Sequence, residues 1–423
     1  MAAVLGAMLS GVVAMQARAT SQPAAPPQLC VNNHCSSGST ANGPIKWNPG
    51  HYMASNGVIY PGKTLANFEA EMQDIGTFDN VVGYRVFITW GALEPAKGRY
   101  DFSVLDAMLA LLKTRFNKPK HLVVALLPAS FGGQLGNNDG KVVPVYLQQD
   151  SAYGPSPTPG MYGWWGASSH GVSSSAYSAA LWRPAVMNRF IALLQAMGAH
   201  YNSDPNFEAV MFQEDSGPPG AATPKGAPQA PDYSSAAMVA QYEAMMTAAT
   251  AAFPNTSFVM ENTWGTNSVP DTENLEVWMV KNRIAPGSAD TIGQSVFDKY
   301  GFNGLFLNFG MQTYVGAGVA GSNYTGGDLR LQAHAMMDVE ADDLAGAYFG
   351  RWGGPFSALD VINALNQTYQ ASHAFWTRLI GTEPVRGGGT VNSEAPGARW
   401  SNLGPVINAH PLLHTDYPPN YPK

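Results

Sequence analysis

Charged residues are scarce in this chain. Asp, Glu, Lys and Arg make up 13% of its 423 residues and leave a formal net charge of −7. Because no basic stripe could neutralise phosphates, nucleic acid is not an expected partner. Beyond the amino terminus, no segment approaches the roughly 20 apolar residues of a membrane-spanning helix, so no membrane span is expected.

Signatures of two common enzyme classes are absent as well. The sequence contains neither the Gly-x-Ser-x-Gly elbow of serine hydrolases nor the His-Glu-x-x-His helix of zinc proteases. Its nine histidines are scattered along the chain. A single histidine is more often a hydrogen-bonded structural residue than a metal ligand. We therefore predict no metal site and no cofactor.

Aromatic residues and loop formers are abundant instead. With 45 Gly and 31 Pro the chain has many ordered loops, and its ten Trp and 18 Tyr exceed what a core of this size needs. An aromatic surplus in a polar, loop-rich chain suits stacking against sugar rings, with ordinary packing as the alternative. At 45% hydrophobic residues, the chain can also bury a large core.

The amino terminus is typical of an exported protein. Residues 2–15 are small and apolar, and Ala17-Arg18-Ala19 fits the small-x-small cleavage pattern. We expect a signal peptide over 1–19, a Pro- and Ser-rich leader over 20–44, and a mature protein that is secreted or periplasmic. The two cysteines, Cys30 and Cys35, lie in this leader. Their spacing favours a local disulfide over a metal site, which would need more ligands than His34 and two thiolates.

From about residue 45 the chain alternates between strand-like and helix-like segments, which predicts an α/β fold with a parallel sheet. We predict a single (β/α)8 TIM barrel with long βα-loop insertions over residues 45–380, and a tail over 381–423 packed on it. The segment 128–175 is the longest insertion, and insertions of this length are usually functional. The expected strands lie near 50–53, 81–89, 121–127, 208–212 and 257–260, and the expected helices lie over 65–75, 102–116, 180–200 and 235–252.

The second half of the barrel is harder to predict. Residues 291–296 and 304–308 compete for the sixth strand, and 331–339 fits either a seventh strand or a helix. Residues 345–351 are the expected eighth strand. A closing helix is expected over 358–379, because its apolar residues recur at helical spacing. They are Ile362, Leu365, Tyr369, His373 and Trp376.

Glu214 follows a short apolar stretch at 207–212 and precedes a Gly-Pro-Pro turn. A buried parallel strand rarely carries a charge, so a Glu just past its carboxyl end is expected to face the cleft where barrel enzymes place their active sites. The alternative is an acidic residue that only starts a solvated loop.

A more specific pattern follows the second expected strand. Residues 84–103, YRVFITWGALEPAKGRYDFS, resemble the W-x-x-x-E-P-x-x-G-x-Y-D-F-S segment of clan A glycoside hydrolases. These are retaining (β/α)8 enzymes that include families 5, 39 and 42, and no single family is matched. The resemblance implies that Glu94 and Asp101 shape the loop and are not catalytic, with Asp101 or Ser103 capping the next helix.

The same resemblance implies an acid/base Glu at the end of strand four and a nucleophile Glu at the end of strand seven. Glu214 fits the first role and Glu340 the second, with Asp338 as the near competitor. Asp342 and Asp343 are more distant ones. Gln213 stands where most clan members carry an Asn that contacts the sugar 2-hydroxyl, and its amide offers the same groups on a longer arm.

Several residues are expected to support such a site. Arg85, within the second strand, can point inward to keep the nucleophile ionised, or can form a structural ion pair. His51 is expected at the end of the first strand, near a substrate hydroxyl. The resemblance implies a sugar-stacking Trp at the end of strand eight, where Trp352 is expected. Further candidates for aromatic platforms are Trp90, Trp264, Tyr314 and the Trp164-Trp165 pair, with core packing as the alternative for each.

Together these features predict a secreted glycoside hydrolase that cleaves a poly- or oligosaccharide by a retaining two-carboxylate mechanism. One carboxyl must be protonated to assist the leaving oxygen and the other ionised to attack. The alternatives are a catalytically silent barrel that binds glycan and a transglycosylase that remodels surface polysaccharide. The sequence predicts neither the oligomeric state nor the sugar and its linkage.

Overall fold

The computed structural model describes most of the chain from residue 44 onward. The described residues are 44–130, 135–155, 162–165, 177–212, 230, 232–261, parts of 271–298, 336–339, 357–377, 382–385, 389–392 and 400–418, and the short strands at 30–31 and 34–35. Residues 1–38 form a compact unit separate from residues 39–423. In the first unit, β1 (Cys30–Val31) pairs antiparallel with β2 (His34–Cys35), and Cys30 is the register partner of Cys35. Residues directly opposite in such a pair have Cα atoms within disulfide range, so the local disulfide remains a prediction that this backbone permits.

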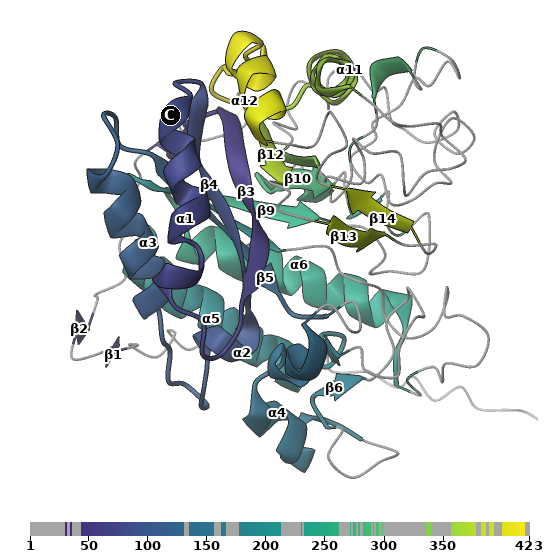
Figure 1. The fold of residues 1–423 in the computed structure, drawn as a ribbon. Coiled ribbons are helices and arrows are strands. Elements are labelled where there is room, and N and C mark those ends of the chain that lie inside the picture. The colour runs from purple at the N-terminus through teal and green to yellow at the C-terminus, as the bar shows by residue number, and fades with distance from the viewer. Residues whose placement is uncertain are drawn as a thin grey trace, which may run out of the picture. The chain divides into compact units, whose positions relative to one another are not determined.

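Eight parallel strands form a closed barrel in the second unit (Figure 1). Strand β12 pairs with β3 and β10 pairs with both β9 and β11, which completes the ring. The predicted (β/α)8 barrel is therefore confirmed. In chain order the strands are β3 (Gly50–Ile59), β4 (Val81–Thr89), β5 (His121–Leu127), β8 (Phe207–Phe212), β9 (Ser257–Glu261), β10 (Ala285–Ser288), β11 (Met336–Val339) and β12 (His373–Thr377).

The helices alternate with these strands along the chain. They include α3 (Ser103–Thr114), α5 (Pro184–Tyr201), α6 (Ser235–Ala252) and α11 (Ala358–Ala364). The helix expected at 65–75 is instead three short turns, η1 (Leu65–Asn67), α1 (Glu69–Met72) and η2 (Gln73–Thr77). Phe68 interrupts the helical backbone between the first two turns, at φ −120° and ψ −16°. None of the helices in the described part of the chain combines the length and apolarity that a bilayer crossing requires.

Two strands of the second half differ from the sequence prediction. The sixth strand is β10, and residues 294–295 are helical, so the expected strand at 291–296 is wrong. The other candidate, 304–308, lies outside the described residues. The eighth strand is β12, and its residues fall inside the closing helix predicted over 358–379, so that part of the helix prediction is wrong. That helix ends early because a π-helical turn, η6 (Leu365–Tyr369), and Gln370 at φ 52° reverse the chain before the strand. The eighth strand expected at 345–351 is therefore wrong as well, and those residues lie outside the described part.

The segment expected as a tail contains the last helix of the barrel. α12 (Trp400–Ala409) follows β12, and the Trp400 ring lies edge-on to Phe78, with 6.2 Å between centroids. The chain then returns to the start of the barrel. The Ile45 N–H donates to the Tyr417 hydroxyl at 2.9 Å, and the Trp47 indole donates to the Thr415 carbonyl at 2.8 Å.

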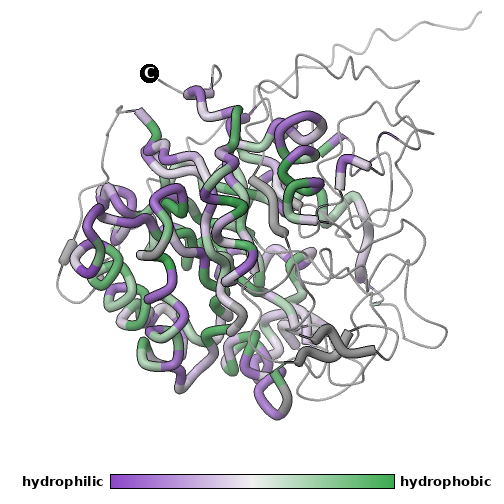
Figure 2. Tube along the Cα trace, turned by 45° about the horizontal axis from the view of Figure 1, so that its top comes forward, coloured by the Kyte–Doolittle hydropathy of each residue, from purple (hydrophilic) through white to green (hydrophobic). Residues whose placement is uncertain are grey.

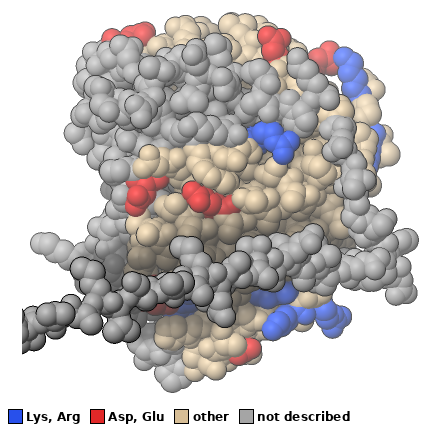
Figure 3. Space-filling model, turned by 180° about the vertical axis from the view of Figure 1, so that it is seen from behind, with Lys and Arg blue, Asp and Glu red and all other residues tan. Residues whose placement is uncertain are grey.

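The strands separate two apolar clusters. The larger one lies between the strands and the surrounding helices, and Figure 2 shows hydrophobic residues on the strands and on the helix sides that face them. The smaller one lies inside the barrel and contains many small side chains. Its members are Tyr52, Ala54, Val123, Ala125, Ala209, Met211, Val259, Ala285 and Phe375. On the described surface in Figure 3, Lys and Arg form only small separate groups, so this face has no continuous basic stripe.

Candidate active site

Two strands of the barrel end within two residues of the two predicted catalytic glutamates in the chain. β8, the fourth strand, ends at Phe212, and Gln213 and Glu214 are the next residues in the chain. β11, the seventh strand, ends at Val339, and Glu340 is next. Because all eight strands are parallel, their carboxyl ends form one rim, where barrel enzymes carry their active sites.

Gln213, Glu214 and Glu340 themselves lie outside the described residues. The nearest competitor, Asp338, lies within β11 as the register partner of Phe375, and therefore does not follow the strand. Residues 331–339 were open to either a strand or a helix, and the structure has a strand there. The fourth and seventh strands thus precede Glu214 and Glu340 in the chain, as the roles of acid/base and nucleophile require.

Arg85 lies inside the barrel, as one of its two interpretations expected. It is fully buried, its register neighbours are Ala54 and Val123, and its guanidinium carbon lies 3.9 Å from the Phe87 ring centroid. The Phe375 ring is 5.6 Å away. Stacking on aromatic faces stabilises a guanidinium by about 0.5–2 kcal/mol, and small neighbours such as Ala54 leave room for it. The interior therefore holds a positive charge four residues below the end of β4.

Among the described residues, Glu261 lies at the carboxyl rim. Glu261 is the last residue of β9, one residue beyond the expected end of that strand, and is fully buried. Val259 belongs to the interior cluster, so side-chain alternation along β9 directs Glu261 to the interior too. Its register partner on β10 is Gly287, and the preceding Met260 pairs with Phe212 at the end of β8. A buried carboxylate therefore lies at the rim on the strand beside the one that leads to Glu214.

His51 lies at the other end of the barrel from its expected position. β3 continues to Ile59, so His51 is the second residue of that strand and lies at its amino end. Its Nε2 is 2.9 Å from the His410 carbonyl, and its Nδ1 accepts from the Trp376 indole at 2.9 Å. Burial lowers the pKa of His51 to about 4, so the ring is neutral near pH 7. The expectation at the strand's carboxyl end is wrong, and His51 connects β3 to β12 and to the end of α12.

Trp90 and Glu94 form part of the packing beside β4. Trp90 opens α2 (Trp90–Leu93) and is fully buried, with its ring 5.0 Å from that of Phe190. Its indole donates to Glu94 Oε2 at 2.8 Å, and Glu94 also accepts from the Gly98 N–H and pairs with Arg189. A buried ring with these contacts has no face for a sugar, so the packing alternative holds for Trp90.

The carboxylate of Asp101 has the structural position that the resemblance implied. Its Oδ1 accepts from the Ser103 N–H at 3.0 Å, at the first residue of α3. Together with the contacts of Glu94, this bond shapes the loop between β4 and α3. These contacts fit the structural role expected for both carboxylates.

Of the remaining candidates for aromatic platforms, the structure describes the side chain of Trp164 alone. Trp264, Tyr314 and Trp352 lie outside the described residues. By chain position Trp352 comes between β11 and α11, so the expectation that it ends the eighth strand is wrong. Trp164 is described and partly exposed.

We expected neither a P-loop nor a glycine fingerprint for a dinucleotide, but two glycine motifs in the sequence fit these consensus patterns. Residues 57–64, GVIYPGKT, fit the P-loop spacing. In the structure Gly57 lies inside β3, and the Lys63 N–H closes a tight turn on the Tyr60 carbonyl at 3.0 Å. Pro61 has no N–H to offer, and a three-residue 3-10 turn follows in place of a long helix. This turn is not a phosphate cradle. The second motif, GAGVAG at 316–321, lies outside the described residues.

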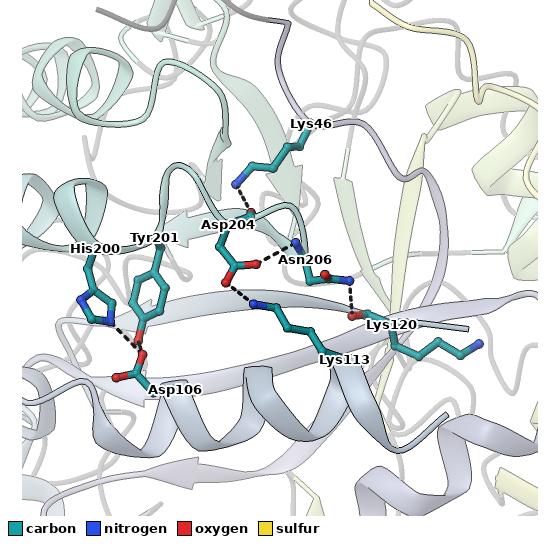
Figure 4. Close-up of polar contacts among 8 residues, drawn as sticks. All are labelled: Lys46, Asp106, Lys113, Lys120, His200, Tyr201, Asp204 and Asn206. Atoms are coloured by element: carbon teal, nitrogen blue, oxygen red, sulfur yellow. Dashed lines mark hydrogen bonds and ion pairs between the residues drawn. The ribbon is translucent and has the colours of Figure 1, made fainter. Parts of the chain in front are cut away.

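The amino end of the barrel carries a polar network of a structural kind (Figure 4). The Lys46 ammonium donates to the Asp204 carbonyl at 2.8 Å, and the Asp204 carboxylate pairs with Lys113. The same carboxylate accepts from the Asn206 N–H, and the Asn206 amide donates to the Lys120 carbonyl. Polar contacts at the amino end of such a barrel stabilise the fold, because active sites lie at the opposite end. In the described residues, no three His, Cys, Asp or Glu side chains are grouped to hold a metal ion.

No protein-family model and no curated protein matches the chain. Among solved structures, endo-glycoceramidase II from Rhodococcus sp. is similar over 49% of this chain and 49% of its own, at 14% identity and a TM-score of 0.31. Exo-beta-1,4-mannosidase Op5Man5 from Opitutaceae bacterium strain TAV5 is similar over 53% of this chain and 34% of its own, at 13% identity and a TM-score of 0.31. GH5_18 from Streptomyces cattleya is similar over 51% of this chain and 45% of its own, at 13% identity and a TM-score of 0.30. These matches span about half of each neighbour's length or less. Similarity of this extent assigns no activity, and the fold assignment rests on the strand order of the barrel.

Proposed function

We propose that this protein is a secreted or periplasmic glycoside hydrolase that cleaves O-glycosidic bonds of a poly- or oligosaccharide with retention of configuration. Glu214 would act as acid/base and Glu340 as nucleophile. The observation that supports this most is the strand order: the fourth strand of a closed parallel barrel ends two residues before Glu214, and the seventh ends one residue before Glu340. Barrel hydrolases need two carboxyl groups at one rim, and the carboxyl ends of the strands that precede Glu214 and Glu340 belong to one rim.

The reaction would take place in two steps. Glu340, ionised, attacks the anomeric carbon while Glu214, protonated, donates its proton to the leaving oxygen, which yields a glycosyl-enzyme ester and the free alcohol. Glu214, now ionised, then takes a proton from water, and the hydroxyl oxygen displaces Glu340 from the anomeric carbon. The two carboxyl groups of a retaining enzyme lie about 5–5.5 Å apart.

The position of Arg85 supports different roles for the two glutamates, with Glu340 ionised and Glu214 protonated. Its buried guanidinium places a positive charge inside the barrel, below the rim. A nearby cation lowers the pKa of a carboxyl group, which favours the ionised form that a nucleophile needs. Gln213, before Glu214, would contact the sugar 2-hydroxyl with its amide.

Glu214→Gln and Glu340→Gln test the proposal, with Glu243→Gln as the matched control. Glu243 is a partly exposed residue of α6, outside the barrel. On a panel of soluble polysaccharides and aryl glycosides, each rim variant is expected to lose at least about 10²–10⁴-fold in kcat/KM. The control is expected to match the parent, and product stereochemistry by NMR is expected to show retention.

The same panel separates the alternatives. A silent glycan-binding barrel would hydrolyse no substrate before any substitution. A transglycosylase would lengthen acceptor chains without releasing reducing ends. Full activity in both rim variants would refute the assignment of Glu214 and Glu340.

A further inference from the structure

Two aromatic rings stack on the insertion that follows the third strand. β6 (Trp164–Trp165) and β7 (Ser178–Ala179) form a two-stranded antiparallel ribbon, and Tyr177 precedes β7. The rings of Trp164 and Tyr177 are nearly parallel, with 4.2 Å between centroids and 19° between planes. Both side chains are partly exposed.

The ribbon is attached to the carboxyl end of β5. The Ala179 N–H donates to the Pro128 carbonyl at 2.9 Å, directly after the last residue of that strand. The Ser130 N–H donates to the Tyr177 carbonyl at 2.7 Å, and the Tyr177 N–H donates to the Ser130 hydroxyl at 3.1 Å. Since Ser130 is buried, the backbone of Tyr177 is held against the barrel rim.

Contacts outside this attachment also hold the stacked rings in place. A Cβ built on Gly140 would lie 3.4 Å from Tyr177 Cζ, so the hydroxyl end of that ring rests on the glycine. On the Trp164 side, the Gly163 N–H donates to the Leu147 carbonyl and the Ala180 N–H donates to the Gly163 carbonyl. The pair is therefore formed in the free protein, and a ligand would not have to order it.

The pair belongs to the same rim as the proposed catalytic residues. The Gly91 N–H of α2, which follows β4, donates to the Val142 carbonyl of the insertion at 2.9 Å. In Figure 1, α2, α4 (Val145–Gln149) and β6 lie together at one end of the barrel. This is the end at which β4 and β5 leave the sheet, and it is opposite to the end that carries His51.

The exposure of Trp164 sets it apart from most described tryptophans. Trp90, Trp182, Trp376 and Trp400 are buried, and Trp47, Trp164 and Trp278 are partly exposed. Trp47 contacts Thr415 and His373 at the amino end of the barrel. Trp278 contacts the core without a stacked aromatic neighbour among the described residues. Trp164 thus combines partial exposure, an aromatic neighbour and a position at the carboxyl rim.

We infer that Trp164 and Tyr177 form a sugar-binding subsite away from the bond that is cleaved, and that the substrate is accordingly a chain of several sugars. The C–H groups of a pyranose face match the negative face of an aromatic ring, and the indole N–H and phenol O–H can bind hydroxyl groups at its edge. This inference rests on the proposed function for the location of the scissile bond. Binding energy from such a remote subsite can be used in the transition state, so it raises kcat/KM for long substrates only.

Trp164→Ala tests the subsite, with Trp164→Phe as the conservative variant and Trp278→Ala as the matched control. The first measurement is electrophoresis in native gels with barley β-glucan, konjac glucomannan or xylan, with each variant built on the Glu214→Gln, Glu340→Gln protein so that no polysaccharide is digested. At least one polysaccharide is expected to retard the parent. Trp164→Ala is expected to weaken the affinity for that polysaccharide about tenfold. Trp164→Phe is expected to keep part of the affinity, and Trp278→Ala is expected to keep all of it.

The second measurement compares kcat/KM of the active forms on an aryl monoglycoside and on oligosaccharides of increasing length. Trp164→Ala is expected to lower kcat/KM for the long substrates and to leave the monoglycoside unchanged. Equal loss on both substrates, retention of Trp164→Ala equal to the parent's, or no retardation by any polysaccharide would overturn the subsite. Undiminished hydrolysis in the Glu214 and Glu340 variants would instead overturn the catalytic assignment and leave the binding result intact.

Discussion

His373 Nε2 lies 3.3 Å from Glu208 Oε1, and both side chains are fully buried at the amino end of the barrel. The same carboxylate accepts from the backbone N–H and the side-chain amide of Asn48, at 2.8 and 2.7 Å. The Tyr52 hydroxyl in turn donates to the Asn48 carbonyl. One buried carboxylate thus connects the fourth strand to the eighth and to the segment that enters the first.

This carboxylate makes the stability of the barrel sensitive to acid. Burial alone would raise the pKa of Glu208, but the hydrogen bond and charge of His373 and the two hydrogen bonds from Asn48 lower it to about 2. Lys46, Tyr52 and His121 are further titratable groups that interact with it. Because the folded pKa lies below the unfolded value of about 4.3, the contribution is complete above that pH and is lost as the pH falls toward 2.

Glu208→Gln is expected to lower the free energy of unfolding by about 3–5 kcal/mol near pH 7, because it removes one partner of a buried pair. Thermal unfolding between pH 7 and pH 2 measures this. The parent should lose stability between about pH 4 and pH 2, and the variant should lose less over that window. Glu69→Gln is the control, since Glu69 pairs with Arg115 at the surface. An equal acid response in parent and Glu208→Gln would contradict the assignment.

Glu94 provides a second test that separates structure from catalysis. Its buried carboxylate accepts from Trp90 and Gly98 and pairs with Arg189. Glu94→Gln leaves Arg189 without its charged partner, so we expect a loss of about 3–5 kcal/mol in unfolding free energy. Below the unfolding temperature, kcat should remain within a few-fold of the parent. A specific loss of kcat without a fall in Tm would show that Glu94 acts in the reaction.

The first five strands could be predicted because each contains a short apolar stretch, such as HLVVALL in β5, although the continuation of β3 past Met53 to Ile59 was missed. The sixth could not, because β10 reads APGS, and Pro and Gly are depleted from strands. Pairing with β9 and β11 produces that strand, and this pairing has no local sequence signal. In β12, His373 and Trp376 continue the helical spacing of Leu365 and Tyr369, so the pattern concealed the break at Gln370.

The candidate site, too, could be predicted only in part. A charge just after an apolar strand is visible in sequence, so the strands leading to Glu214 and Glu340 could be anticipated. The contacts of His51 could not, since its carbonyl partner His410 lies 359 residues away on a segment without a strand pattern. Glu261 was visible as a strand end, but its burial depends on pairing with β8 and β10.

Identification of the nucleophile is a third test, because Glu261 and Glu340 both follow or end strands at the rim. A 2-deoxy-2-fluoro glycoside of an accepted sugar forms a stable ester with the nucleophile of a retaining enzyme, and peptide mass spectrometry locates it. We expect the label on Glu340. Azide should restore turnover to Glu340→Ala and yield a glycosyl azide, but should not restore Glu261→Ala. A label on Glu261 would transfer the nucleophile role and leave the reaction class unchanged.

Arg85 offers the last test, through the pH dependence of the reaction. Its buried positive charge lowers the pKa of a nearby carboxyl group, so its removal should raise the pKa of the nucleophile. The nucleophile must be ionised to attack, and the acid limb of the kcat/KM profile reports its pKa in the free enzyme. Arg85→Met should therefore move that limb to higher pH by about one unit or more, with activity recovering as the pH rises. Arg85→Lys retains the charge and should leave the limb near its original position, although it stacks less well on Phe87. A loss of activity that is equal at every pH in both variants would indicate that Arg85 serves packing alone.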